Sequence, residues 1–218
     1  LQSGWMVANK HRLAGLGAHG AVVLGMLVLA LGQIGWALIW LTALHLAIDL
    51  AKTRARPGLA AFLADQGAHG VSLIALALWQ PGLWANGLWQ GVPAAAGVMA
   101  LMAGLLLATR AAGFAIGLLM QPFATSAPDG LPGGGRVIGW LERSLIFLMV
   151  LIGQPEGVGL LIAAKSILRF GAVKDDRAVS EYVIIGTLAS FGLALLAAYG
   201  TQILLAALPP IGILPTTP

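Results

Sequence analysis

Five side chains in the first third of the chain are of types that bind transition metals, although the segments around them are strongly apolar. They are His19, His45, Asp49, Asp65 and His69. His45 and Asp49 are four residues apart, as are Asp65 and His69, so each pair would share one face of a helix. The chain has no cysteine, so any metal must be bound by imidazole and carboxylate, which suit Zn, Mn and Fe. The spacing therefore predicts a metal site between three helices.

The same residues allow two other interpretations. A histidine within an apolar helix commonly hydrogen-bonds to a neighbouring helix, and His–Asp pairs also build proton relays. A metal site, a relay or ion path, and structural polar packing are therefore all open at the level of the sequence.

A second group of polar side chains lies between residues 142 and 182, within the motifs LERSL, AAKSILRF and SEYVIIGT. Its members are Glu142, Arg143, Lys165, Arg169, Glu181 and Tyr182. Lys165 and Arg169 are four residues apart, so two cations would share one helix face and repel each other unless an anion lies against them. One interpretation is a network of interhelical ion pairs that uses Glu142 and Glu181. The other is that Arg143, Lys165 and Arg169 bind a phosphate or a carboxylate.

The composition indicates which elements must position these residues. Of the 218 residues, 59% are hydrophobic and 9% are charged, whereas a soluble domain is about 25% charged. We therefore expect an all-α, polytopic transmembrane helix bundle of about seven spans, each of about 20 residues. The predicted spans are 13–31, 34–51, 59–79, 93–110, 137–152, 157–170 and 181–208. Residues 111–120 are too few to cross alone, so they either extend the fourth span or lie in the interface.

Turn residues and charges divide the chain and orient it. The segment SAPDGLPGGG predicts a loop at 126–136, which separates a four-span part, 1–125, from a three-span part, 137–218, of one membrane domain. Lysine and arginine gather at alternate connections, whereas the others, such as 80–92, contain none. Because short cytoplasmic loops carry the excess positive charge, we expect the N-terminal end in the cytoplasm and the C-terminal end outside. The cations are scattered, which argues against nucleic acid as a partner.

Several longer motifs point to a known family. They are LQSGWMVANK, HLAIDLAK, FLADQGAHG, LERSLIFLMVLIG, AAKSILRF and EYVIIGTLASF. In combination they resemble the bacterial polytopic membrane family catalogued as domain of unknown function 3307, over most of the chain. The resemblance implies a location in the bacterial inner membrane and assigns no activity. It also implies a further apolar helix, with its own His and Asp, ahead of the LQS element.

Three functions are compatible with these features. The first is a metal-dependent hydrolase, in which the five His and Asp side chains hold an ion that activates water, while Arg143, Lys165 and Arg169 hold an anionic, lipid-like substrate. The second is a carrier for a metal ion, a proton or a small anion. The third is a non-catalytic subunit of a larger membrane complex, in which membrane lipids and partner subunits cover the apolar helices.

Overall fold

The computed structural model describes residues 13–126, 131–170 and 177–211. Within these ranges the chain folds into helices joined by short connections, and none of the described residues lies in a strand. The expectation of an all-α fold is therefore confirmed. The chain divides into two compact units, Leu1–Pro93 and Ala94–Pro218.

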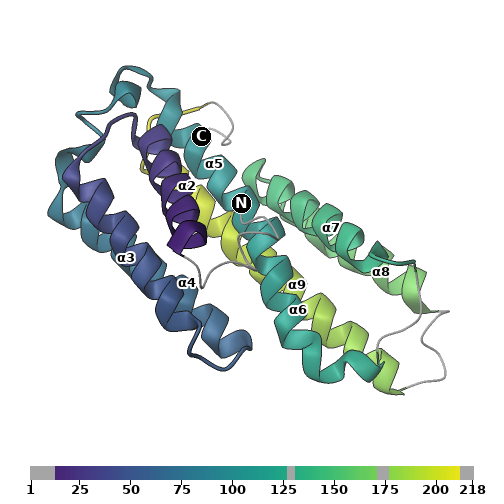
Figure 1. The fold of residues 1–218 in the computed structure, drawn as a ribbon. Helices are drawn as coiled ribbons and strands as arrows, with labels where there is room; N and C mark the ends of the chain where they lie inside the picture. The colour runs from purple at the N-terminus through teal and green to yellow at the C-terminus, as the bar shows by residue number, and fades with distance from the viewer. Residues whose placement is uncertain (1–12, 127–130, 171–176, 212–218) are drawn as a thin grey trace. The chain divides into compact units, whose positions relative to one another are not determined.

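The first unit is built around three helices, α2 (Leu13–Leu31), α3 (Trp36–Lys52) and α4 (Leu59–Trp79). Two short 3-10 turns, Pro81–Leu83 and Leu88–Gly91, follow α4. Helix α3 packs against both α2 and α4, as Figure 1 shows. Because the connections between them are short, successive helices run antiparallel.

The segment after α4 closes one end of this unit against the α2–α3 turn. The backbone N–H of Leu88 donates to the carbonyl of Gly32 over 3.0 Å. The indole N–H of Trp89 donates to the carbonyl of Leu29 over 2.7 Å. Gly32 has a φ of 65°, a left-handed conformation that glycine adopts without steric cost. These bonds fix the turn that joins the two helices.

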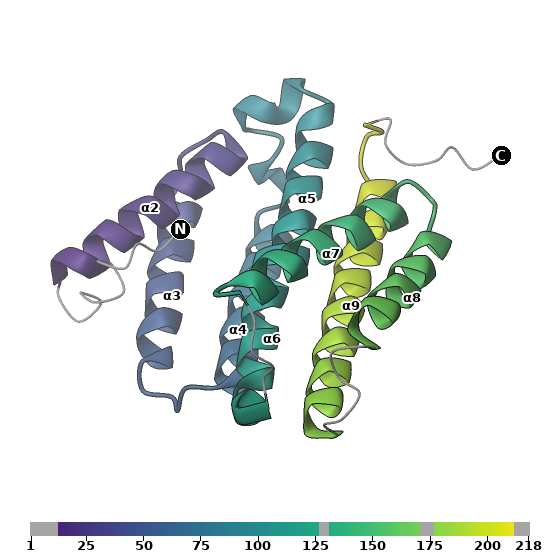
Figure 2. The same cartoon turned by 90° about the vertical axis from the view of Figure 1, so that its right-hand side faces the viewer.

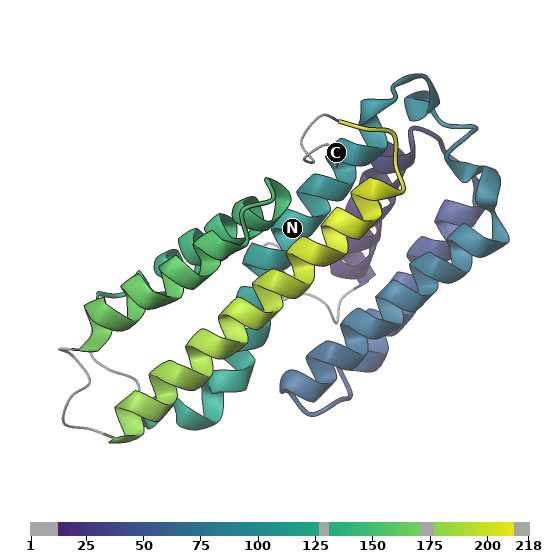
Figure 3. The ribbon, with the colours of Figure 1, turned by 180° about the vertical axis from the view of Figure 1, so that it is seen from behind.

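The second unit has one long helix as its centre. Its elements are α5 (Ala94–Leu106), a π-helical turn η3 (Leu107–Ala111), α6 (Ala112–Met120), a 3-10 turn (Gln121–Ser126), α7 (Gly134–Leu151), α8 (Glu156–Phe170) and α9 (Arg177–Ala206). Helix α9 packs against α5, α6 and α7, and α8 packs against α7 (Figures 2 and 3). Phe147 and Ala198 lie in its core. The boundary at 126–136 that composition indicates falls within this unit.

Four stretches of the described chain are long and apolar enough to cross a membrane. They are Ala14–Leu31, Leu59–Trp79, Ala94–Thr125 and Arg177–Ala206. The number of spans expected from the sequence, about seven, is therefore corrected to four candidates among the described residues. Residues 111–120 continue the fourth predicted span, because α5, η3 and α6 follow one another without a break.

The other three predicted spans are not among these candidates. Helix α3, with 17 residues, is at the lower end of the length that crosses a bilayer, and α8, with 15, is below it. Helix α7 has 18 residues but carries Arg136, Glu142 and Arg143, and each charge is costly in hydrocarbon. The predicted topology places the two ends of the chain on opposite sides of the membrane, which requires an odd number of crossings. Four crossings would leave both ends on the same side, so this topology stays a prediction.

Gly104 of α5 allows a close contact between helices of the second unit. A Cβ added there would overlap Thr201 Oγ1 and would lie 3.0 Å from Phe147 Cζ. We expect Gly104→Ala to lower the free energy of unfolding by about 1–3 kcal/mol, measured by thermal or chemical unfolding in detergent. Gly192→Ala is the control, because no described neighbour lies within 4 Å of its added Cβ. An equal loss of unfolding free energy in the two variants would contradict the close contact at Gly104.

Candidate metal centre

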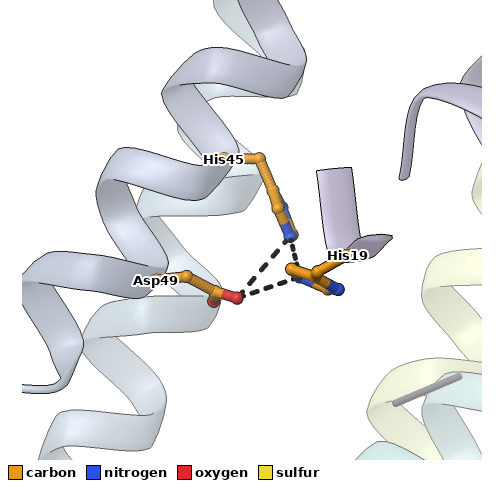
Figure 4. Close-up of side chains that lie close together, drawn as sticks. All are labelled: His19, His45 and Asp49. Carbon is orange, nitrogen blue, oxygen red and sulfur yellow. Dashed lines mark hydrogen bonds and ion pairs between the residues drawn. The ribbon is translucent and has the colours of Figure 1, made fainter. Parts of the chain in front are cut away.

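Three polar side chains from α2 and α3 point toward one another in the first unit (Figure 4). His19 Nε2 lies 3.1 Å from His45 Nε2 and 3.0 Å from Asp49 Oδ2. His45 Nε2 lies 3.9 Å from the same carboxylate oxygen. The three side chains are mostly buried, with exposed fractions of 11%, 24% and 13%.

Two of these three separations fit two ligands of one bound ion, and the third, 3.9 Å, is wider than a tetrahedral site gives. Two ligand atoms at about 2.1 Å from the same metal lie about 3.0–3.5 Å apart. A cavity of about 10 Å³ borders His19 and Asp49, and this is about the space that one water molecule requires. The three groups could therefore hold a metal ion.

Local structure explains why the three groups meet. His45 and Asp49 are one helical turn apart, so both project from the same face of α3. Helix α2 approaches this face closely, because a Cβ added to Gly20, next to His19, would lie 3.0 Å from Leu46 Cδ1. A small residue thus brings the imidazole of α2 within reach of the pair on α3.

His69 of α4 lies beside these three residues, with its ring centroid 4.3 Å from that of His45. Its Nδ1 atom is 2.8 Å from the carbonyl oxygen of Asp65. A carbonyl only accepts hydrogen bonds, so Nδ1 carries the proton and Nε2 carries the lone pair. That Nε2 is buried and has no hydrogen-bond partner within the described ranges. It is therefore available to bind a ligand or to accept a proton.

Asp65 is buried and shares its carboxylate among several neighbours. Its Oδ2 accepts hydrogen bonds from Lys52 Nζ over 2.6 Å and from Gln66 Nε2 over 3.0 Å. Its Oδ1 accepts no hydrogen bond from any described residue. Ligand atoms of Asp49, Asp65 and His69 all lie within 4.8 Å of one another. The five residues singled out in the sequence thus lie in two overlapping groups that share Asp49.

Lys52 is a member of this cluster that sequence reasoning missed. It lies in the last turn of α3, three residues after Asp49, so the helical repeat places both on one face. Lysine is common at the cytoplasmic ends of membrane helices, so the position of Lys52 in the sequence indicated only the orientation of the chain in the membrane. Its carboxylate partner lies on α4, and this contact between helices has no signature in the sequence.

The second predicted group is not gathered into one site. Lys165 Nζ donates to Glu142 Oε2 over 2.7 Å, so this cation is paired with a carboxylate. Glu181 accepts a hydrogen bond from Arg177 Nε over 2.8 Å, a partner that sequence reasoning did not assign to it. The side chain of Arg169 lies outside the described part of the structure.

Arg143 and Tyr182 meet at a cavity of the second unit. They line this cavity, which has a volume of about 520 Å³, together with Arg110 and Arg136. Sequence reasoning assigned Arg110 and Arg136 only to membrane topology. Arg136 and Arg143 are seven residues apart in α7, a spacing that places both on one helix face, but no sequence signal places Arg110 of η3 beside them.

Comparison with known proteins identifies a family for the first unit. Residues 1–88 match the family described as "Protein of unknown function (DUF3307)". No curated protein and no solved structure matches the chain. The match is shorter than the resemblance read from the sequence, since the motifs from Leu141 onward lie outside it. All five His and Asp residues of the candidate metal centre lie within it, and the match confirms the resemblance to this family over residues 1–88.

Proposed function

We propose that the first unit is a membrane-embedded metal site in which His19, His45 and Asp49 hold a divalent transition metal that activates water for hydrolysis. The convergence of three ligand atoms within 3.9 Å carries this proposal. Helices α2 and α4, which flank α3, are both candidate membrane spans. This supports a location at a membrane, which we place at the bacterial inner membrane.

The number of ligands favours a reactive ion over a structural one. Structural zinc sites use four protein ligands, whereas catalytic sites use three and leave one position for water. A cavity of about 10 Å³, the lower limit for one water molecule, borders His19 and Asp49. A metal-bound water loses its proton near neutral pH and becomes a nucleophile.

His69 is the candidate general base. Its Nε2 lone pair has no hydrogen-bond partner among the described residues, and its ring contacts that of His45. The Asp65 carbonyl accepts the Nδ1–H and thereby fixes the tautomer that can receive a proton at Nε2. Lys52 neutralises the Asp65 carboxylate, so the surroundings of the base carry little net charge.

The substrate we propose is anionic and lipid-like. Apolar helices would bring a lipid to the site from the bilayer, and a divalent ion would attract an anionic headgroup. Zn, Mn and Fe all accept two imidazoles and one carboxylate. The ligand types therefore do not distinguish these metals, and elemental analysis would identify the one that is bound.

The test is to purify the full chain in an uncharged detergent and to measure its metal content and its activity. We expect about one Zn, Mn or Fe ion per chain by inductively coupled plasma mass spectrometry. Hydrolysis of phosphatidate or of a lipid ester should disappear on chelation and return when the same metal is added. A chain that retains none of these ions after incubation with each would contradict the metal site. A metal-loaded chain that cleaves none of the lipids would contradict hydrolysis alone.

A proton path is a second candidate function, because six ionisable side chains lie next to one another in succession. They run from Asp49 through His19, His45 and His69 to Asp65 and Lys52, with His69 Nδ1 3.7 Å from Asp65 Oδ1. Histidines pass protons readily near neutral pH. Chains reconstituted into liposomes that contain a pH-sensitive dye would separate the candidates. Proton flux in metal-free buffer that is lost in His69→Ala favours the path, and hydrolysis without flux favours the enzyme.

A further inference from the structure

The second unit contains a cationic cavity that the proposed metal site does not use. It has a volume of about 520 Å³ and is lined by Arg110, Arg136 and Arg143, with Trp140 and Tyr182 beside them. None of the described residues that line it is a carboxylate. Within the described part of the chain, three guanidinium groups therefore border one space without an acidic side chain among them.

Arg143 is the buried member of this group, with 4% of the residue exposed. Its Nη1 donates to Ser190 Oγ over 3.1 Å, and its Nη2 donates to the Thr109 carbonyl over 3.0 Å. Both acceptors are neutral, and Nε has no acceptor within the described ranges. A buried guanidinium without a carboxylate partner is unfavourable. Glu142 acts on this charge electrostatically, and an anion in the cavity would stabilise it further.

Glycine residues make room for this guanidinium. A Cβ added to Gly113 of α6 would lie 2.8 Å from Arg143 Nη2, and a Cβ added to Gly139 of α7 would lie 2.8 Å from Nη1. Any larger residue at either position would displace the group. The two helices thus fix the guanidinium at the wall of the cavity, which is a property of a preorganised binding site.

The two acidic side chains that are next in sequence to described lining residues of this cavity are paired with other cations. Glu142 precedes Arg143 in α7, but its Oε2 accepts from Lys165. Glu181 precedes Tyr182 in α9, but its Oε1 accepts from Arg177. Arg110 stacks on the Trp140 ring, with 4.4 Å between Cζ and the ring centroid. This contact orients a second guanidinium and leaves its positive charge in place.

We propose that this cavity binds a phosphate group through Arg110, Arg136 and Arg143. Guanidinium groups bind phosphate through paired, charge-assisted hydrogen bonds, and several of them together fit its three or more oxygens. The Tyr182 hydroxyl offers a further donor. The phosphate could belong to a lipid headgroup or to a free ion, and the chemistry of recognition is the same. The site is independent of metal binding in the first unit.

Two double variants of the full chain test this site. Arg110→Gln with Arg136→Gln removes two exposed cations of the cavity, while Arg54→Gln with Arg56→Gln removes two exposed cations of the α3–α4 connection. Native mass spectrometry in an uncharged detergent would measure retention of phosphatidate, with phosphatidylcholine as the neutral comparison. We expect phosphatidate affinity to fall at least about tenfold in the first double variant and to change less than about twofold in the second. Metal content should be the same in both.

Competition by inorganic phosphate distinguishes the two sources. If millimolar phosphate displaces phosphatidate from the unaltered chain, the cavity recognises the phosphate group itself, free or on a lipid. If phosphatidate stays bound and only the Arg110/Arg136 variant loses it, the ligand is a lipid headgroup. Equal losses in the two double variants, or equal retention of phosphatidate and phosphatidylcholine, would overturn the proposal. So would the absence of binding by either probe.

Discussion

Replacing His45 by alanine is expected to abolish retention of the transition metal by the first unit. His45 supplies one of three converging ligand atoms, 3.1 Å from His19 Nε2. Loss of a residue that only orients a ligand weakens metal binding about 10- to 100-fold, so loss of a ligand should weaken it by about 100-fold or more. Equilibrium dialysis followed by elemental analysis measures the affinity. His19→Ala and Asp49→Ala should behave in the same way.

Two other substitutions test whether the loss of metal affinity is specific to the ligand residues. Thr42→Ala alters the same helix one turn earlier and removes only a hydrogen bond to the Leu38 carbonyl, so it should leave metal affinity unchanged. His69→Ala should keep the ion, with affinity reduced by no more than about 100-fold, but should lose hydrolysis. If His45→Ala keeps the affinity of the unaltered chain, these three residues do not form the site.

The second large effect concerns the ion pair of the second unit. Replacing Glu142 by leucine should lower the free energy of unfolding by about 3 kcal/mol, because it leaves a mostly buried ammonium without its partner. The Glu142 carboxylate accepts from Lys165 over 2.7 Å, and the two side chains are 12% and 15% exposed. Chemical unfolding in detergent, followed by circular dichroism, measures the change.

The double variant Glu142→Leu with Lys165→Met provides the internal check. It removes both charges, so its stability should return to within about 1 kcal/mol of the unaltered chain. Arg177→Ala breaks a pair whose side chains are 92% and 58% exposed, and it should cause no measurable change, since water screens such pairs. A Glu142→Leu variant as stable as the Arg177→Ala variant would show that the buried pair contributes nothing.

Helix positions were largely readable from the sequence. The predicted spans 13–31 and 59–79 coincide with α2 and α4, and 157–170 differs from α8 by one residue. Apolar runs and the charges or turn residues that end them are local features, and helices depend on local hydrogen bonds. Seven spans were predicted where four candidates are described, because α3 and α8 are short helices and α7 carries three charges.

The partners of each polar side chain were decided by tertiary structure. The sequence determined that His45 lies on the same face as Asp49, because residues four apart in a helix always do. It did not determine that His19 completes this pair while Lys52 reaches Asp65, or that Lys165 binds Glu142 instead of an anion. Each residue turns the helix face by about 100°, so contacts between helices depend on how each is rotated and packed against its neighbour. That rotation is set by close approaches such as Gly20 against Leu46, which lie far apart in the chain.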